Sequence, residues 1–375
     1  MKYRKFGDTG LKVSVLGFGA MRLPTINGDS GNINEEEAIK MIRFAIDRGV
    51  NYIDTAWPYH DGNSEILVGK ALKDGYREKA MVATKLPVWS VEKIADADEI
   101  LDKQLEKLDL DYIDFYLLHA LNKNSWEKMK ELNILQWLEK ARDDGKIKYI
   151  GFSFHDEYTV FKEIVDAYNW DFCQIQYNYL DTEYQAGRKG LQYAHDKGLA
   201  VVIMEPLRGG LLAGEAPAEV KRILKENNIN NSMADLALQW LWNQKEVSVV
   251  LSGMSTMEQV KENILSAASS GVNSLSPEEI DVIEEIADKM RGPIRCTRCA
   301  YCMPCPNGVN IPENFYLYNN AKLFDRFEEN QERYHKMEES NRAENCIQCA
   351  QCEEVCPQNL PIIKLLEEVA AYFNR

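Results

Sequence analysis

Short apolar runs alternate with longer stretches of helical periodicity from Val13 to about Met290. Runs of about four to eight β-branched or apolar residues favour strands, whereas apolar residues at intervals of three and four favour helices. Their alternation is typical of an α/β fold built on a parallel sheet. Eight strands are predicted, over Val13–Gly19, Tyr52–Ala56, Met81–Leu86, Tyr112–His119, Ile147–Ser153, Phe172–Asn178, Leu199–Glu205 and Val247–Gly253. Eight such repeats predict a closed (β/α)8 barrel, the TIM barrel.

Capping residues mark several of the predicted helices. Asn34 followed by Glu37 has the spacing of a capping box, and it predicts the start of a helix over Glu35–Arg48 that Gly49 ends. Apolar residues on one face of this helix would lie against the barrel. Further helices are predicted over Trp126–Asp144, over Ser232–Gln244 and from Ser276-Pro277 onward.

The two ends of the barrel sequence carry distinct signals. Lys2–Phe6 and Lys12–Leu16 flank Asp-Thr-Gly and predict a hairpin that closes the bottom of the barrel. At the other end, Arg291-Gly292-Pro293 breaks the helical pattern and a cysteine-rich segment begins. We therefore predict two domains, the barrel over residues 1–290 and a smaller domain over residues 291–375.

Composition and charge narrow the class of protein. Asp and Glu outnumber Lys and Arg by 59 to 44, and the resulting net charge of −15 disfavours a nucleic-acid partner. No stretch approaches the roughly 18 apolar residues of a membrane span, and the N-terminus lacks an apolar signal segment. We therefore expect a cytoplasmic protein without a membrane or nucleic-acid partner. In a reducing cytosol, nine cysteines favour metal or redox chemistry over disulfides.

Four polar residues follow one another at the ends of three successive predicted strands. Asp54 ends the second strand, Tyr59 lies in the loop after it, Lys85 ends the third strand and His119 ends the fourth. The carboxyl ends of the strands meet at one mouth of a (β/α)8 barrel, so these four side chains can converge.

The segment from Asn51 to Tyr59, Asn-Tyr-Ile-Asp-Thr-Ala-Trp-Pro-Tyr, is followed by Asn63-Ser64-Glu65. This pattern resembles the signature of the aldo-keto reductase superfamily, and the resemblance covers about residues 1–290. In that family the four positions at the barrel mouth form a catalytic tetrad. The resemblance therefore implies reduction of an aldehyde or ketone by hydride from NADPH or NADH.

The resemblance also assigns roles to the four residues. Tyr59 would donate a proton to the carbonyl oxygen, and His119 would orient that oxygen. A phenol is a weak acid at neutral pH, so the ammonium of Lys85 would lower the pKa of Tyr59. The carboxylate of Asp54 would keep Lys85 charged and in place.

A dinucleotide groove is implied by further family positions. Ser153 and Gln174 match residues that bond the nicotinamide carboxamide, and Glu262-Asn263 matches the adenine end of the groove. The chain departs from the family at two points. Phe154 stands where asparagine is frequent, and Met204 replaces the tyrosine that commonly stacks on the nicotinamide.

The residues expected near a 2′-phosphate also differ from the family pattern. Gly253 and Gln259 stand where many members have Lys and Arg. Loss of both cations weakens discrimination in favour of NADPH. Arg208 or Lys261 could supply the missing charge, or either could be an ordinary surface residue.

Eight of the nine cysteines form two runs in the last 80 residues, Cys296-x2-Cys299-x2-Cys302-x2-Cys305-Pro306 and Cys346-x2-Cys349-x2-Cys352-x3-Cys356-Pro357. The second run has the spacing of bacterial [4Fe–4S] ferredoxins. Zinc ribbons use paired cysteines rather than four in a row, so zinc is the weaker interpretation. The remaining thiol, Cys173, lies in a predicted strand and is expected in the core.

Two-cluster ferredoxins exchange the fourth cysteine of each run. That pattern implies one [4Fe–4S] cluster on Cys296, Cys299, Cys302 and Cys356 and another on Cys346, Cys349, Cys352 and Cys305. The connector between the runs, including Phe315–Ser340, has helical composition and resembles the helical ferredoxin modules of respiratory reductases. The tail after Pro361 is predicted to be an amphipathic helix that packs on its own domain or on the barrel.

Two functions remain open from the sequence. The protein could be an NAD(P)H-dependent carbonyl reductase whose clusters exchange electrons with a ferredoxin, a flavodoxin or another redox carrier, or are structural. Alternatively, it could be an electron-transfer protein whose barrel binds a flavin or a partner and has no carbonyl reductase activity. The four tetrad residues favour the first function, whereas Phe154 and Met204 leave room for the second.

Overall fold

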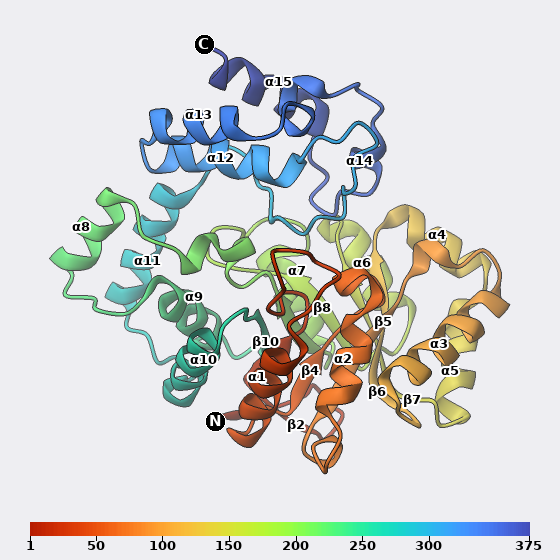
Figure 1. The fold of residues 1–375 in the computed structure, drawn as a ribbon. Coiled ribbons are helices and arrows are strands. Elements are labelled where there is room, and N and C mark those ends of the chain that lie inside the picture. Colours follow the sequence, from red (N-terminus) through yellow and green to blue (C-terminus); the bar gives the residue numbers. More distant parts are fainter. The chain divides into compact units, whose positions relative to one another are not determined.

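The computed structural model describes all 375 residues of the chain (Figure 1). Its contacts define two compact units. The first consists of Met1–Pro206 and Asp235–Leu275, and the second of Leu207–Ala234 together with Ser276–Arg375. The division between residues 290 and 291 expected from the sequence stays a prediction.

The first unit contains a closed barrel of eight parallel strands, which confirms the predicted fold class. Strands β5 and β10 have the predicted bounds, and the others differ by a few residues at their ends. The first predicted strand is divided, because its first residues belong to the N-terminal hairpin rather than to the barrel. The barrel strands are β3 (Leu16–Gly19), β4 (Tyr52–Asp54), β5 (Met81–Leu86), β6 (Ile113–Leu121), β7 (Ile147–Phe154), β8 (Phe172–Gln176), β9 (Ala200–Met204) and β10 (Val247–Gly253).

The N-terminal hairpin pairs β1 (Tyr3–Lys5) with β2 (Lys12–Ser14) in antiparallel register. Phe6, directly after β1, is fully buried and packs among side chains of the barrel strands. Its ring lies 4.7 Å from Phe115 and 5.3 Å from Phe172, measured between ring centroids. The hairpin therefore closes the amino-terminal end of the barrel, as predicted, and it does so with the ring of Phe6.

Helices follow the barrel strands. Asn34 caps the first helix as predicted, because its side chain accepts a hydrogen bond from the backbone of Glu37. The single helix predicted over Trp126–Asp144 is wrong: Asn133 takes a left-handed conformation with φ of 54° and separates two helices. These helices are α1 (Glu35–Asp47), α2 (Ser64–Ala71), α3 (Ile94–Leu108), α4 (Lys123–Glu131), α5 (Ile134–Asp143), α6 (Tyr158–Ala167), α7 (Gly187–Asp196), α9 (Met233–Trp242) and α10 (Met257–Ser269).

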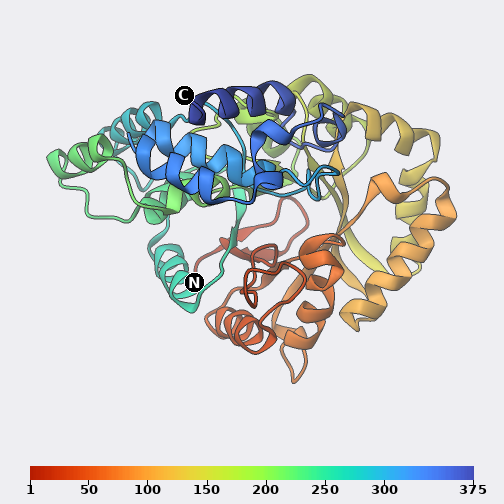
Figure 2. The ribbon, with the colours of Figure 1, turned by 45° about the horizontal axis from the view of Figure 1, so that its top comes forward.

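The second unit is helical. Helix α12 packs against both α13 and α15 (Figure 2). The hydrophobic core of the unit joins these helices with the loops that carry the cysteines. The connector predicted to be helical is interrupted near Asp325, whose φ is 51°. No helix of the chain is long and apolar enough to cross a bilayer. The helices of this unit are α8 (Ala218–Glu226), α11 (Pro277–Met290), α12 (Ile311–Leu323), α13 (Phe327–Lys336), α14 (Gln351–Glu354) and α15 (Ile362–Phe373).

Candidate functional site

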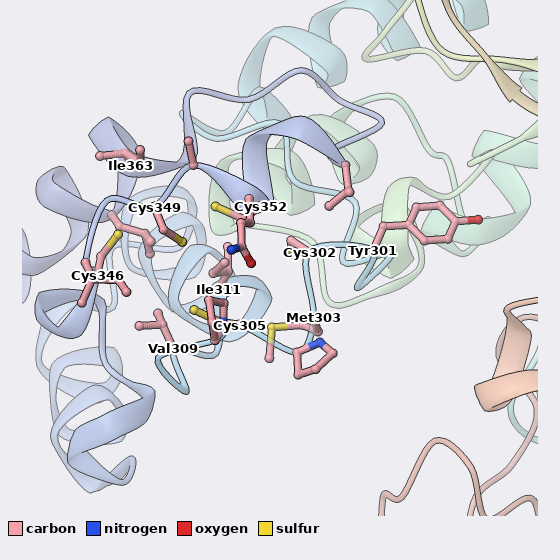
Figure 3. Close-up of a pocket in the computed structure, with 17 residues that line it drawn as sticks. Tyr301, Cys302, Met303, Cys305, Val309, Ile311, Cys346, Cys349, Cys352 and Ile363 are labelled. Carbon is pink, nitrogen blue, oxygen red and sulfur yellow. The ribbon is translucent and has the colours of Figure 1, made fainter. Parts of the chain in front are cut away.

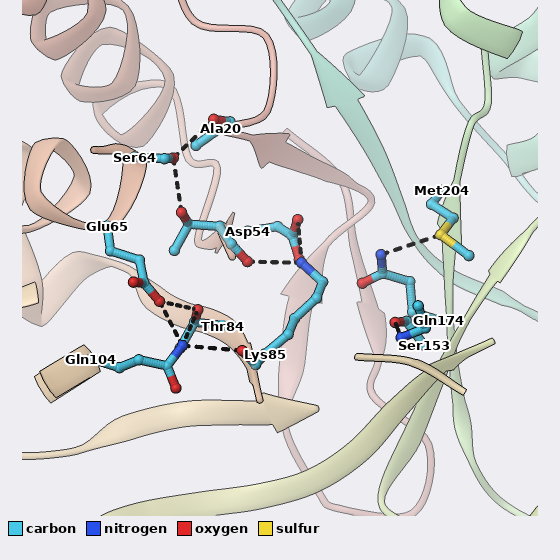
Figure 4. A network of polar contacts seen from close by, with 12 residues as sticks. Ala20, Asp54, Ser64, Glu65, Thr84, Lys85, Gln104, Ser153, Gln174 and Met204 are labelled. Carbon is cyan, nitrogen blue, oxygen red and sulfur yellow. Dashed lines mark hydrogen bonds and ion pairs between the residues drawn. The ribbon is translucent and has the colours of Figure 1, made fainter. Parts of the chain in front are cut away.

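A buried ion pair lies at the carboxyl ends of two neighbouring strands. Lys85 Nζ of β5 is 2.8 and 2.9 Å from the two carboxylate oxygens of Asp54 of β4, and it donates a third bond to the carbonyl of Thr55 at 2.8 Å (Figure 4). Both side chains are almost completely buried. Burial lowers the pKa of Lys85, and the adjacent carboxylate of Asp54 opposes that shift. The carboxylate therefore holds a desolvated ammonium in a fixed position.

Tyr59 and His119 complete a cluster around this ion pair. Lys85 Nζ is 5.0 Å from the centroid of the Tyr59 ring. The rings of Tyr59 and His119 meet edge to face with centroids 6.3 Å apart. Tyr59 is 8% exposed and His119 is 4% exposed. The structure thus brings together all four residues predicted at the barrel mouth.

A bulge sets the position of His119. Strand β6 extends past His119 to Leu121, and its register with β7 shifts between Leu118 and Leu121. Ala120 has a left-handed φ of 55°, and its backbone N–H donates to Ser153 Oγ at 2.7 Å. A bulge of this kind re-aims a side chain at the rim of a barrel. Burial, reinforced by the charge of Lys85, holds the pKa of His119 well below the usual 6.5.

A second histidine near this site gives a prediction for stability. Burial lowers the pKa of His155 from 6.5 to about 4 in the folded chain. The unfolded chain therefore binds a proton first as the pH falls, and folding stability decreases between about pH 6.5 and 4. A pKa separation of this size corresponds to about 3 kcal/mol. We expect His155→Gln to reduce the loss of unfolding free energy over this range by up to that amount.

Urea unfolding followed at several pH values measures this effect. His195→Gln, on α7, is the control substitution, because it removes an imidazole from the same unit outside the site. Equal pH slopes for wild type and His155→Gln would contradict the assignment of His155 as a group that desolvation keeps neutral in the folded chain.

The sequence did not predict a buried polar network that packs behind the ion pair. Glu65 accepts hydrogen bonds from Thr84 Oγ1 at 2.7 Å and from Gln104 Nε2 at 2.6 Å. Gln104 also donates to the carbonyl of Lys85 and accepts from Tyr116 at 2.8 Å. The network ties α2 and α3 to the strand that carries Lys85. The position of Thr84 could have been predicted from the sequence. Side chains alternate along a strand, so the residue before an inward-pointing Lys85 points toward the surrounding helices.

Ser153 and Gln174, predicted to bond the carboxamide, lie side by side in the register of β7 and β8. Gln174 Nε2 contacts Met204 Sδ at 3.5 Å, and Gln174 Oε1 is buried without a hydrogen-bond partner. A buried acceptor of this kind is suited to a ligand that carries an N–H donor. Phe154 points away from this groove and packs against Phe161 of α6, with ring centroids 5.1 Å apart.

Other residues predicted for the dinucleotide lie in α10, directly after β10. Asn263 Nδ2 donates to Ser252 Oγ at 2.8 Å, so these two side chains hold the middle of α10 against the end of β10. Gln259 Oε1 accepts a hydrogen bond from the backbone of Ser255 at 2.8 Å. The amide of Gln259 therefore orders the loop between β10 and α10, whereas the amide of Asn263 ties the helix to the strand.

Gly253 has a neighbour that the sequence did not identify. A Cβ atom at Gly253 would lie 3.3 Å from the aliphatic carbons of Arg22, so the lack of a side chain leaves room for the arginine. Ser255 Oγ also donates to the carbonyl of Arg22 at 2.8 Å. Glu262 is exposed on α10. Arg208 is buried and belongs to the second unit.

In the second unit, the eight cysteines surround two cavities. A cavity of about 200 Å³ is lined by Cys305 from the first run and by Cys346, Cys349 and Cys352 from the second, with Cys302 also at its wall (Figure 3). A smaller cavity of about 20 Å³ is lined by Cys296, Cys299, Cys302 and Cys356. The grouping around each cavity is the exchanged pattern predicted from the sequence.

The chemistry of these donors suits iron–sulfur clusters. Only thiols and apolar or neutral polar side chains line the two cavities, and soft thiolates select iron–sulfur clusters and related metals. Burial and the nearby thiols of Cys299 and Cys296 raise the pKa of Cys302, so ionised thiols here need a compensating cation. The smaller cavity has room for about one water molecule, and its thiols must move apart to hold a cluster.

A closed (β/α)8 barrel with an Asp, Tyr, Lys and His cluster at its mouth defines a class of oxidoreductases, and the comparisons with known proteins agree. The chain belongs to the aldo/keto reductase family, which matches residues 15–288. A 4Fe-4S dicluster domain matches residues 295–360. The protein is therefore an oxidoreductase of the aldo-keto reductase type with an appended iron–sulfur domain.

Relatives and solved structures cover the barrel. The chain is 30% identical to L-galactose dehydrogenase of Arabidopsis thaliana over 78% of this chain and 96% of the relative. It is 27% identical to an NADH-specific methylglyoxal reductase of Escherichia coli K12 over 77% of this chain and 99% of the relative. A holo-form aldo-keto reductase structure from Bacillus halodurans is 29% identical with a TM-score of 0.64, covering 76% of this chain and 96% of the other.

Proposed function

We propose that the protein reduces small aldehydes or ketones with hydride from NADH or NADPH. The observation that carries this proposal is the buried contact of Lys85 with Asp54, with the ring of Tyr59 5.0 Å from the ammonium. An adjacent ammonium stabilises the phenolate that remains after Tyr59 gives up its proton. His119, neutral at physiological pH, can donate or accept a hydrogen bond and so orient the carbonyl oxygen.

The residues of the dinucleotide groove would hold the cofactor, which supplies the hydride when bound. Gln174 Oε1, a buried acceptor, would receive an N–H of the carboxamide, and the hydroxyl of Ser153 would bond the same group. Glu262 and Asn263 would lie at the adenine end. Gly253 and Gln259 would lie near the ribose and the phosphates.

The names of two relatives indicate a substrate class. One is a methylglyoxal reductase and the other an L-galactose dehydrogenase, so both act on small, oxygen-rich molecules. Trp89 lies 5.0 Å from His119, measured between rings, and is 49% exposed, so it offers an aromatic wall beside the reacting carbonyl. We therefore propose short hydroxy- or oxo-aldehydes as the first substrates to test.

The second unit would carry two [4Fe–4S] clusters. One would be held by Cys296, Cys299, Cys302 and Cys356, and the other by Cys305, Cys346, Cys349 and Cys352. These clusters would transfer electrons to or from an external carrier or support the fold. A hydride donor moves two electrons at once, so direct exchange with a one-electron centre needs an intermediary such as a flavin.

Anaerobically purified protein tests the proposed reaction. The assay follows NADH or NADPH oxidation with methylglyoxal, glyceraldehyde and short ketones, and the reverse reaction with hexoses. Iron, sulfide and flavin are quantified in the same sample. Carbonyl-dependent oxidation without flavin supports the proposal, whereas bound flavin with no carbonyl-dependent turnover would favour an electron-transfer function of the barrel.

Cofactor choice gives a second prediction. Gly253 and Gln259 carry no charge, so we expect the dissociation constants of NADPH and NADH to differ by less than about tenfold, equivalent to about 1.4 kcal/mol. One relative is described as NADH-specific, in line with this expectation. Titration of protein fluorescence with each nucleotide measures the ratio.

Arg22 is a candidate source of positive charge near the 2′-phosphate, because its aliphatic carbons lie over Gly253. A preference for NADPH of about a hundredfold would contradict the prediction. If Arg22→Ala then abolished that preference while Lys261→Ala did not, Arg22 would be the source of the missing cation.

A further inference from the structure

The two sets of thiols differ in their exposure. Cys349 is the one exposed thiol among the nine cysteines, and it lines the larger cavity. Two large apolar side chains on the wall of the same cavity are also exposed, Ile347 by 60% and Val355 by 52%. We refer to Ile347, Cys349 and Val355 together as the Cys349 face. None of the four thiols that line the smaller cavity is exposed, since each is partly buried.

The surroundings of the Cys349 face are acidic. No charged residue lines the larger cavity itself. From Glu344 to Glu367 the chain has four glutamates and one lysine, Lys364. Glu344 and Glu354 are exposed and lie within three residues of Ile347 and Val355, respectively, along the sequence. We refer to the exposed Glu344 and Glu354, which flank the face along the chain, as its acidic border.

We propose that the Cys349 face is the docking surface for a one-electron carrier protein whose redox centre lies in an apolar patch bordered by lysines or arginines. The inference rests on the proposed cluster bound by Cys305, Cys346, Cys349 and Cys352. Each encounter moves one electron between this cluster and the redox centre of the carrier, with no proton transferred and no covalent bond formed or broken. The cluster of the smaller cavity, whose thiols are all less exposed than Cys349, does not exchange electrons directly with the carrier.

The acidic border determines the kind of carrier. Opposite charges around a small apolar contact speed association more than they raise affinity, as suits a transient redox encounter. An acidic carrier would be repelled by Glu344 and Glu354 and by the net charge of −15 of the whole chain. This polarity argues against ferredoxins and flavodoxins with acidic faces, which the sequence alone left open.

Electron transfer to ferricytochrome c, a basic haem protein used as the probe, tests the proposal. Full-length protein is reduced with dithionite, freed of excess reductant and mixed with the probe in a stopped-flow cell. We expect Ile347→Lys to lower the second-order rate constant by about tenfold or more. Leu265→Lys on α10, where Leu265 is 72% exposed, makes the same chemical change on the barrel and should change the rate constant by less than about twofold.

Further measurements separate docking from damage to the cluster. Iron content and the reaction rate with a small neutral quinone should be the same in wild type and both variants. Carbodiimide cross-links between probe lysines and Glu354 or Glu344, located by mass spectrometry, should disappear at high salt. With an acidic ferredoxin as the probe, Ile347→Lys should instead accelerate exchange.

Three outcomes would overturn the proposal. In the first, Ile347→Lys and Leu265→Lys lower the rate constant with ferricytochrome c equally. In the second, the cross-links are confined to the barrel. In the third, Ile347→Lys transfers electrons to ferricytochrome c faster than wild type and with a lower sensitivity to salt. Absence of iron from the anaerobic protein is a different result, because it would remove the cluster assignment itself. Intact iron with any of the three outcomes would reject only the docking surface.

Discussion

Tyr59→Phe should lower kcat for carbonyl reduction by about 10²- to 10⁴-fold, the usual contribution of a positioned general acid. The substitution removes the phenolic O–H and keeps the ring that packs edge to face against His119. The Lys85–Asp54 ion pair does not depend on the Tyr59 hydroxyl, so the shape of the site should be preserved. Nucleotide binding, measured by fluorescence quenching, should stay within about twofold of wild type, because the phenol contributes a proton rather than a cofactor contact.

Tyr179→Phe is the matched control for this experiment. Tyr179 is also buried in the barrel unit, and its hydroxyl has no hydrogen-bond partner, so its loss should leave kcat nearly unchanged. If Tyr59→Phe retained activity within a few-fold of wild type, the phenol would not be the proton donor. Equal losses in both variants would instead indicate a general effect of removing a buried hydroxyl.

The tetrad residues illustrate how far a sequence pattern determines a site. Asp54 and Lys85 could be located from the sequence because the ends of apolar runs define the barrel mouth, and a parallel barrel brings those ends together. His119 was placed at the end of its strand, yet the strand continues for two more residues through a bulge. The bulge depends on the bond from Ala120 to Ser153, two residues 33 positions apart. Periodicity reports local conformation and cannot reveal such a long-range pair.

The residues of the site that the sequence did not predict also depend on contacts between distant parts of the chain. The amide of Gln104 bonds Glu65 and the backbone of Lys85, which come from different helices and strands. Arg22 lies over Gly253, more than 200 positions away in the chain. The local sequence around each of these residues does not differ from that of an ordinary helix or loop. Their roles arise only when the barrel closes and brings α3 and the β10–α10 loop to the site.

The second unit shows the opposite case, in which spacing within the chain carried most of the information. The exchange of Cys305 and Cys356 between the runs was implied by ferredoxin spacing, and the cavities group the thiols in that way. The structure also has a core of residues such as Phe315, Tyr334 and Phe373, against which several of the cysteines pack. Those residues are separated in the sequence by polar helical faces and loops, so no single apolar run predicted this core.

The second large effect is expected from substitutions of single cluster cysteines. Anaerobically prepared wild-type protein should contain about eight irons per chain, because eight thiolates provide the protein ligands of two [4Fe–4S] clusters. Cys349→Ser removes a ligand of one proposed cluster and should reduce the iron to about four. Cys305→Ser should remove the same cluster, since both thiols line the larger cavity. The double variant of Cys349 and Cys305 should therefore lose no more iron than either single variant.

Combining substitutions across the two cavities tests the pairing of the runs. Cys305→Ser together with Cys296→Ser should remove nearly all iron, although both residues belong to the first run, because they line different cavities. Cys173→Ser is the control, since this thiol is buried in strand β8 of the barrel and should leave eight irons. If each run held its own cluster, the double variant of Cys305 and Cys296 would keep about four irons, and the exchanged assignment would be rejected. Zinc in place of iron in anaerobic protein would reject both assignments.

Because the cysteines pack against the core of α12 and α15, loss of one cluster should also raise amide hydrogen exchange in residues 296–375 while the barrel strands stay protected.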